Sequence, residues 1–234
     1  MKISRKIEVL SMQENVYGGL RYVVRHPADF DENKTYPTVL FLHGAGTISN
    51  DIEVLKSNNF FNHAGKHATS CLVFAPQCDA GTTWFDNFEK LEVLVKMIRD
   101  LPYVDTSRIY LTGNSMGGYG SWQLAMSMSN VFAAVIPVCG GGMYWYSARL
   151  KNMPVWAFHG EDDPVVFCSE SRNMVEGINK RGGNAKLTVY PGCGHNAWDP
   201  AYSTPEVWEW LFSQRRADAK IASATKGMDS KNFG

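Results

Sequence analysis

The sequence predicts an α/β fold, with a doubly wound, mainly parallel β-sheet and helices on both faces. Short, continuous apolar runs of the kind found in buried parallel strands recur along the chain. Segments in which apolar residues have helical spacing separate these runs. This alternation favours βαβ units, whose crossovers place helices on both faces of one sheet. The 234 residues, 44% of them hydrophobic, can fill one large core, and we expect a single domain over residues 1–215.

At the start of the chain we expect two antiparallel strands, over residues 3–10 and 20–25, which are joined by a turn at residues 15–19. Further strands are predicted over 38–42, 71–76, 109–111, 132–138, 155–158 and 185–190. Helices are predicted over 51–67, 88–101, 116–128, 169–181 and 205–214, with one or two helical turns in the linker 143–152. Residues 216–234 are polar and predict a frayed helix or a loose tail.

Composition excludes several classes of partner. The net charge is zero and no basic stripe is present, so neither nucleic acid nor an anionic membrane is an expected partner. No stretch approaches the length of a membrane span, and the first residues lack the apolar core of a signal peptide. The five cysteines are scattered, without a C-x-x-C pair, which is typical of reduced thiols. We therefore expect a cytoplasmic protein, although a signal peptide already removed would leave no trace here.

Residues 108–119 carry the most informative motif of the chain. An apolar strand pattern leads through Gly-Asn-Ser-Met-Gly at 113–117 into a helical pattern, which is the order of a nucleophile elbow around Ser115. Glycine is required at 113 and 117 because a Cβ atom would collide with the neighbouring strand or helix. Alone the motif is weak, since it arises by chance in about one chain in ten of this length. The alternative is an inert serine in a glycine-rich turn.

Other reactive residues lie in the order that supports the functional interpretation. A serine hydroxyl needs a base to take its proton, and a histidine base needs an anion to orient it. The chain supplies Ser115, Asp163 and His195 in this order, each beyond the carboxyl end of a predicted strand, where ligands bind in such sheets. Asp162 and Glu161 are rivals for the acid, and spacing does not separate them from Asp163.

Four motifs connect the chain to a known group of proteins. They are His-Gly-Ala-Gly at 43–46, the elbow at 113–118, His-Gly-Glu-Asp-Asp-Pro-Val-Val at 159–166 and Gly-His at 194–195. Over about residues 34–212 the chain resembles α/β-hydrolase esterases of the phospholipase/carboxylesterase and dienelactone-hydrolase-like group. That group includes small domains similar to feruloyl esterases and to predicted peptidases. The resemblance implies an α/β-hydrolase fold.

The resemblance also implies roles for individual residues. Ser115 is expected to be the nucleophile, His195 the general base and then acid, and Asp163 the residue that orients His195, because relatives keep an aspartate directly before Pro-x-Val. The oxyanion hole is expected to consist of the backbone N–H groups of Ala45 and Met116. Gly46 or Thr47 could add a further donor. Dienelactone hydrolases carry cysteine at the elbow, so Ser115 argues against their cysteine chemistry.

The other histidines have simpler interpretations. His43 and His159 follow predicted strands and are expected to be structural hydrogen-bonding residues. His63 and His67 are spaced i, i+4 like a metal-binding pair, but no H-E-x-x-H glutamate accompanies them. A solvated helix face is the preferred interpretation, and we expect neither a metal nor a cofactor.

The substrate can be predicted only in outline. The short segment between residues 138 and 155 leaves no room for a large lid, which favours soluble esters. Trp84, Trp145 and Trp198 follow strand ends and are either pocket walls or simple loop packing. We expect a carboxylic ester hydrolase that acts on short acyl, aryl or sugar esters through an acyl-enzyme on Ser115. The alternatives are a serine peptidase of the prolyl-oligopeptidase type and a non-catalytic binding protein of the same fold.

Overall fold

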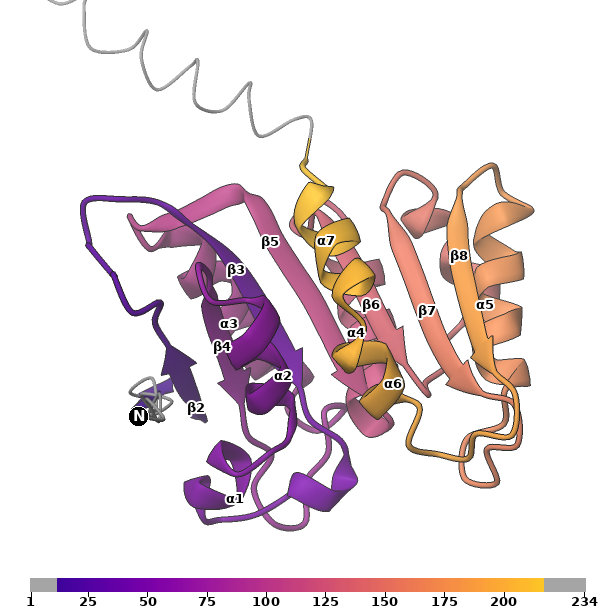
Figure 1. Ribbon diagram of the computed structural model, residues 1–234, viewed down its shortest axis with the longest axis horizontal. Helices are drawn as coiled ribbons and strands as arrows, with labels where there is room; N and C mark the ends of the chain where they lie inside the picture. Colours follow the sequence, from indigo (N-terminus) through magenta and orange to yellow (C-terminus); the bar gives the residue numbers. More distant parts are fainter. Residues whose placement is uncertain (1–11, 217–234) are drawn as a thin grey trace, which may run out of the picture.

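An eight-stranded β-sheet organises residues 12–216, which are the residues that the computed structural model describes (Figure 1). The strand order is β1-β2-β4-β3-β5-β6-β7-β8. β1 and β2 are antiparallel to their neighbours, and the other pairs are parallel. The strands are β1 (Met12–Tyr17), β2 (Leu20–Arg25), β3 (Tyr36–Leu42), β4 (Leu72–Pro76), β5 (Val104–Asn114), β6 (Ala134–Val138), β7 (Val155–Gly160) and β8 (Ala185–Tyr190). The predicted mainly parallel sheet with an antiparallel start is confirmed.

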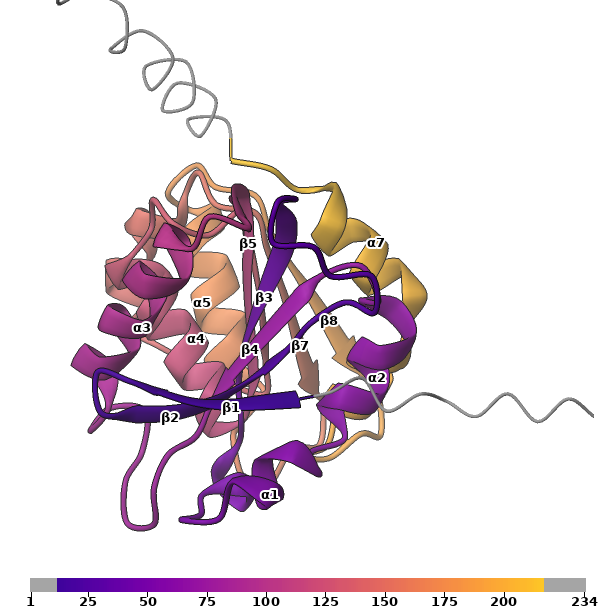
Figure 2. The same ribbon diagram turned by 90° about the vertical axis from the view of Figure 1, so that its left-hand side faces the viewer.

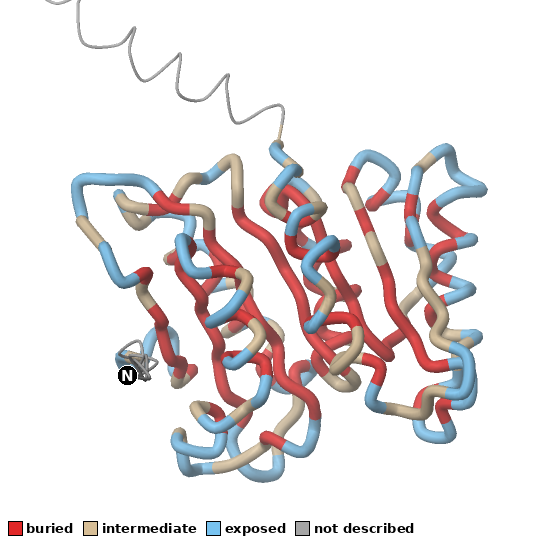
Figure 3. Tube along the Cα trace, in the orientation of Figure 1, coloured by how far each residue is buried: buried red, intermediate tan, exposed pale blue. Residues whose placement is uncertain are grey.

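Helices cover both faces of this sheet (Figure 2). The helices are α1 (Ile52–Lys56), α2 (Phe60–His67), α3 (Phe88–Asp100), α4 (Met116–Ser127), α5 (Ser169–Asn179), α6 (Trp198–Ser203) and α7 (Pro205–Ser213), with 3₁₀ helices η1 (Ala45–Thr47) and η2 (Tyr144–Leu150). α3, α4 and α5 pack on one face and α2, α6 and α7 on the other, so two hydrophobic clusters form, one on each side of the sheet. The central strands are consequently buried over most of their length, except for residues 105–108 in the first part of β5 (Figure 3).

Of two predictions near the start of the chain, one is not tested by the structure and one needs correction. The predicted strand at residues 3–10 lies outside the described residues. The turn predicted at residues 15–19 is shorter, because β1 continues to Tyr17 and pairs with β2 directly. Gly18 and Gly19 form the turn with φ values of 59° and 73°. Two consecutive residues with positive φ make the tight hairpin turn that matches the twist of the strands, so no longer loop is needed.

The helix predicted over residues 51–67 is two helices, α1 and α2. Asp51 caps the first, since its side chain accepts a hydrogen bond from the Glu53 N–H. Asn58 interrupts the segment because its Oδ1 accepts from the Phe60 N–H at 3.0 Å, while its amide donates to the Thr47 hydroxyl at 2.9 Å. Short polar side chains that bind the backbone in this way end one helix and start another.

The parallel strands point their carboxyl ends toward one edge of the sheet, where α1 and α6 lie (Figure 1). Loops that follow β3, β5, β7 and β8 meet at this edge and carry the predicted functional residues. None of the helices between residues 12 and 216 is long and apolar enough to cross a bilayer. The polar tail predicted at 216–234 lies, apart from Arg216, outside the described residues.

Candidate active site

Ser115 occupies a sharp turn between the end of β5 and the start of α4. Its backbone angles are φ 54° and ψ −118°, a left-handed conformation that a residue with a side chain adopts only under strain. The Ser115 N–H donates to the Val138 carbonyl at 2.9 Å, and its own carbonyl accepts from the Tyr119 N–H at 3.0 Å. These two hydrogen bonds hold the strained turn between the sheet and the first turn of α4.

The glycines on either side of Ser115 let three backbone segments approach closely. A Cβ atom at Gly117 would lie only 1.9 Å from the Leu42 carbonyl oxygen, and one at Gly113 only 2.4 Å from the Gly117 carbonyl oxygen. Both distances are far below van der Waals contact, so no other residue fits without displacing α4 from β3. The collision expected from the sequence is therefore present at both positions.

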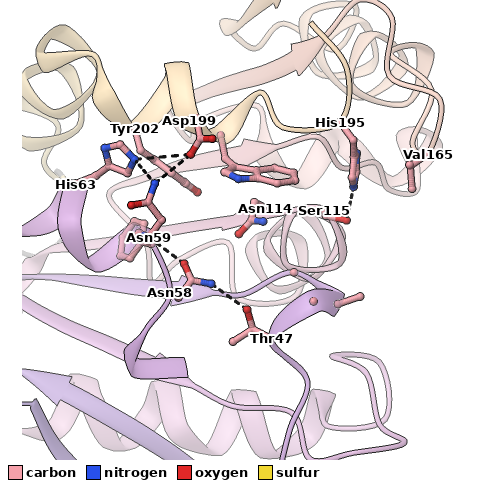
Figure 4. A pocket seen from close by; sticks show the side chains of 15 residues that line it. Thr47, Asn58, Asn59, His63, Asn114, Ser115, Val165, His195, Asp199 and Tyr202 are labelled. Carbon is pink, nitrogen blue, oxygen red and sulfur yellow. Dashed lines mark hydrogen bonds and ion pairs between the residues drawn. The ribbon is translucent and has the colours of Figure 1, made fainter. Parts of the chain in front are cut away.

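Three of the predicted site residues come together in one hydrogen-bonded series. His195 Nε2 lies 2.8 Å from Ser115 Oγ, and His195 Nδ1 lies 2.7 Å from Asp163 Oδ2. A carboxylate can only accept here, so Nδ1 carries the proton and the lone pair of Nε2 faces the serine hydroxyl. Figure 4 shows His195 and Ser115 joined at one end of a pocket. This arrangement lets His195 take the serine proton directly.

Asp163 is the carboxylate that reaches His195, and its environment keeps it ionised. Its Oδ1 accepts hydrogen bonds from the N–H groups of Val165 and Val166 at 2.9 and 3.0 Å. Burial on its own would raise the pKa of Asp163, but the hydrogen bonds from His195 and from the two N–H groups outweigh burial and hold the pKa below its usual range. Glu161 and Asp162, the rivals from the sequence, are exposed.

His159 adds a second imidazole next to the same carboxylate. It is fully buried, its Nε2 lies 2.8 Å from the Val166 carbonyl and 3.3 Å from Asp163 Oδ2, and its Nδ1 lies 2.7 Å from the Ser171 hydroxyl. Burial lowers the pKa of His159, although the Val166 carbonyl and Asp163 act in the opposite direction. The Val166 carbonyl can only accept, so in the neutral ring the proton on Nε2 is donated to it. His159 thus fixes the loop that presents Asp163, which agrees with its expected structural role.

His43 lies under the loop that follows β3. Its Nε2 accepts from the Cys78 N–H at 3.1 Å, and its Nδ1 lies 2.8 Å from the Gly44 carbonyl, to which it donates. Burial lowers the pKa of His43 to about 4. A ring that is neutral and hydrogen-bonded on both sides cannot serve as a base for Ser115. His43 instead shapes the loop that carries Ala45.

The two predicted oxyanion-hole donors begin helical segments beside Ser115. Ala45 is the first residue of η1 and Met116 the first residue of α4. The N–H of a first helical residue has no acceptor within its own helix and remains available to a ligand. Gly44 brings the two segments together, since a Cβ there would lie 2.9 Å from the Asn114 side-chain amide. Ala45 and Ser115 line the same pocket.

That pocket has a volume of about 490 Å³ and extends from Ser115 to α2 and α6 (Figure 4). Its lining comes from the loop after β3, from α2 and the residues just before it, from the elbow, from the loop after β7 and from the segment after β8. The residues are Gly44, Ala45, Gly46, Thr47, Asn58, Asn59, Phe60, His63, Asn114, Ser115, Val165, His195, Trp198, Asp199 and Tyr202. Trp198 stands edge-on to the His195 ring, with ring centres 5.2 Å apart.

Two of the three tryptophans predicted as pocket walls do not line this pocket. Trp84 is fully buried, and its indole N–H donates to the His43 carbonyl at 2.9 Å, so it packs beneath the loop. Trp145 lies in η2, which packs against α5, and is 63% exposed. The prediction failed because a position after a strand does not determine whether a side chain turns toward the core, the solvent or the site. Trp198 does line the pocket.

Sequence reasoning missed the far wall of the pocket. His63 was expected on a solvated helix face, but its side chain is only 13% exposed and lines the pocket together with Asn59. His67 stacks on the ring of Trp208. The short helix α6, which contributes Asp199 and Tyr202, was not predicted. The helical spacing of Asn59 and His63 was visible, but nothing in the sequence indicated that α2 packs beside α6.

Comparison with known proteins gives consistent results. Residues 82–213 match the sequence profile of the dienelactone hydrolase family. A probable feruloyl esterase C of Aspergillus niger is 24% identical over 185 residues, which are 77% of this chain and 68% of that protein. Dipeptidyl-peptidase 5 of Porphyromonas gingivalis is 23% identical over 226 residues, covering 74% of this chain and 32% of that protein.

Among solved structures, a thermostable esterase superimposes with a TM-score of 0.79 at 34% identity, covering 90% of this chain. The predicted α/β-hydrolase fold is thereby confirmed. The chain spans 64% of that esterase and a smaller part of the peptidase, so these proteins contain segments without a counterpart here.

Proposed function

Because the chain belongs to the dienelactone hydrolase family, we propose that it is a serine hydrolase that cleaves carboxylic esters through an acyl-enzyme on Ser115. The observation that carries this proposal is the series Ser115–His195–Asp163, with distances of 2.8 and 2.7 Å. A strained turn directs the serine side chain toward the pocket. Two helical segments begin beside the serine, and the N–H group of the first residue of each has no acceptor within its own helix. The similarity to a feruloyl esterase and to a thermostable esterase supports ester substrates.

The first half of the proposed reaction is acylation. Ser115 Oγ attacks the carbonyl carbon of the ester while its proton passes to His195 Nε2. The ionised Asp163 stabilises the imidazolium that forms. The carbonyl oxygen becomes negative and accepts hydrogen bonds from the N–H groups of Ala45 and Met116. The tetrahedral intermediate then collapses, the bond to the alcohol oxygen breaks, and His195 donates its proton to the departing alcohol.

The second half releases the acid. A water molecule gives one proton to His195 Nε2 and adds its oxygen to the acyl carbon. The resulting intermediate collapses, the bond to Ser115 Oγ breaks, and His195 returns the proton to the serine. The products are one carboxylic acid and one alcohol, and the site is restored. We propose small soluble esters as substrates, with short acyl, aryl or sugar groups, because the segment between β6 and β7 contains only η2 and no long insertion.

Rates on matched esters and amides test the proposal. The purified protein should hydrolyse p-nitrophenyl acetate and butyrate, whereas the corresponding p-nitroanilides should be hydrolysed at least about a hundredfold more slowly, because an amide is a poorer acyl donor. Ser115→Ala should remove several orders of magnitude of the esterase rate while the circular dichroism spectrum stays unchanged. Equal rates on ester and anilide would favour the peptidase alternative. A fully active Ser115→Ala variant would exclude the proposed nucleophile.

A further inference from the structure

The end of the pocket opposite Ser115 is polar and contains a carboxylate. We define the α2–α6 wall as Asn59, which directly precedes α2, His63 from α2 and Asp199 from α6, and all three line the pocket (Figure 4). None of these residues touches Ser115 or His195 through a hydrogen bond. The wall can therefore bind a part of the substrate without taking part in the proposed chemistry.

Asn59 orients the wall and has no spare donor. Its amide nitrogen donates one hydrogen to Asp199 Oδ1 at 3.2 Å and the other to His63 Nε2 at 3.1 Å. Its carbonyl oxygen accepts from the Asn62 side chain at 2.9 Å. Because both amide hydrogens are used, the positions of Asp199 and His63 relative to each other are fixed from α2.

Asp199 keeps free acceptor capacity that faces the pocket. A carboxylate offers about four lone-pair positions. Among residues 12–216 only the Asn59 amide donates a hydrogen bond to this carboxylate. The side chain is 49% exposed, so a ligand in the pocket can reach the unused positions.

The negative charge of Asp199 has no cation from residues 12–216 beside it in the pocket. Burial lowers the pKa of His63, against the opposing effect of Asp199, and the nearby Lys66 and His67 lower it further. With Nε2 accepting from Asn59, the neutral ring carries its proton on Nδ1. Within the part of the chain that the structure describes, no lysine or arginine lines the pocket. The wall thus presents acceptor oxygens and one net negative charge.

We propose that Asp199 makes this pocket select ester substituents that carry hydroxyl groups and reject those that carry a carboxylate. The inference rests on the proposed ester hydrolysis at Ser115. A hydroxyl can donate to Asp199 in a charge-assisted hydrogen bond, which is stronger than a bond between neutral groups. A carboxylate would bring a like charge beside Asp199 into a partly desolvated site. The Trp198 ring, which lines the same pocket and contacts the His195 ring, provides an apolar face for the rest of the substituent.

Hydroxyl donors of this kind have two sources, and matched substrates distinguish them. In the first arm, methyl esters of cinnamic acid with and without a ring hydroxyl test a phenolic donor in the acyl group. In the second arm, acetyl glucose and ethyl acetate test hydroxyls of a sugar alcohol. The monomethyl ester of succinic acid and methyl butyrate, which are similar in length, measure the discrimination against a carboxylate. p-Nitrophenyl acetate, which carries neither a hydroxyl group nor a carboxylate, measures the basal activity.

The variant Asp199→Asn keeps the size of the side chain and removes its charge. In at least one arm, the preference in kcat/KM for the hydroxylated ester should fall on the order of fivefold, since hydrogen bonds to charged groups are the stronger ones. The discrimination against the succinate monoester should fall by a similar factor, while p-nitrophenyl acetate stays within about twofold. The control Asp100→Asn removes the same charge from an exposed position on α3 and should change none of these ratios.

Unchanged ratios in Asp199→Asn, with normal hydrolysis of p-nitrophenyl acetate, overturn this inference and leave the proposed function intact. An equal loss on every ester also overturns it, because Asp199 would then act on the shape of the site. Absence of hydrolysis by the unmodified protein overturns the proposed function itself.

If Asp199→Asn does not fold, the dependence of the unmodified protein on salt concentration provides the test. Raising salt from 0.05 to 0.5 M should relieve the discrimination against the succinate monoester at least about twofold, because salt screens exposed charges. Constant discrimination would again overturn the inference.

Discussion

Three consecutive acidic residues follow β7, and only the conformation of the chain gives one of them a special role. Asp163 is buried and accepts from His195 and from two backbone N–H groups, while Glu161 and Asp162 point into solvent. All three are carboxylates, and burial would raise the pKa of Asp163, but its hydrogen bonds hold that pKa below its usual range. The difference between these carboxylates therefore comes from their hydrogen-bond donors.

Exchange of each aspartate for asparagine should separate the two positions. Asp163→Asn should lower kcat by about 10⁴-fold, because an amide at this place favours the wrong tautomer of His195. Asp162→Asn, the matched control, should retain most of the activity. Initial rates on p-nitrophenyl butyrate at pH 7.5 measure both. If Asp162→Asn is the more damaging change, the acid of the series has been assigned to the wrong residue.

Buried histidines should make the stability of the protein depend on pH. His43 is fully buried, and its pKa is lowered from 6.5 to about 4. The folded state thus binds this proton less well than the unfolded state, so the contribution to stability is complete above pH 6.5 and is lost as the pH falls through 4. The magnitude is about 3 kcal/mol. Urea unfolding at pH 7 and pH 4 measures this loss in the free energy of unfolding. The variant His43→Gln should lose less stability than the unmodified protein between pH 7 and pH 4. The same loss in both proteins would contradict the assignment to His43.

At the scale of elements, the junction of β5 and α4 depends on backbone contact. Gly117→Ala places a methyl group 1.9 Å from the Leu42 carbonyl oxygen, so α4 must move away from β3. We expect a loss of stability of more than about 2 kcal/mol and the loss of most esterase activity. Gly46→Ala is the control for stability, because a Cβ there meets nothing within 4 Å. Thermal unfolding compares the two, and equal melting temperatures would show that the elbow tolerates a side chain.

The elements that the sequence predicts well are those with a strong local signal. Each predicted parallel strand is present, and β5, Ser115 and α4 follow in the expected order. The prediction of one helix over residues 51–67 failed because its interruption depends on the Asn58 side chain, which bonds to Thr47 and Phe60. The helix α6 has only six residues and no apolar period long enough to be recognised. Its position follows from contact with α2 and not from its own sequence.

At the scale of the whole molecule, the sequence predicts the catalytic end of the pocket much better than the far end. Ser115, Asp163 and His195 follow strand ends, and a parallel sheet brings such ends to one edge. The far wall joins Asn59 to Asp199 across 140 positions of the chain, through packing between two short helices. The burial of Trp84 depends in the same way on tertiary contacts, and the sequence around this residue does not predict it.

The open pocket leads to a prediction about the physical state of the substrate. Within residues 12–216 the segment between β6 and β7 contains only η2, so no long insertion there covers Ser115. Short-chain esters should be hydrolysed as dissolved monomers, with a rate that saturates below the solubility limit. Rates on p-nitrophenyl butyrate and tributyrin across their solubility limits test this expectation. A sharp rise in rate only when droplets appear would indicate interfacial activation.

Covalent labelling tests most directly the central claim that Ser115 is a nucleophile activated by His195. The protein is treated with a fluorophosphonate, and intact-mass spectrometry followed by peptide mapping identifies the modified residue. We predict one label per chain on Ser115, and no label on folded Ser115→Ala or His195→Ala over the same time. The paired distances of 2.8 and 2.7 Å that join Ser115, His195 and Asp163 are the basis of this expectation. Labelling of another residue, or undiminished labelling of Ser115→Ala, would contradict the account.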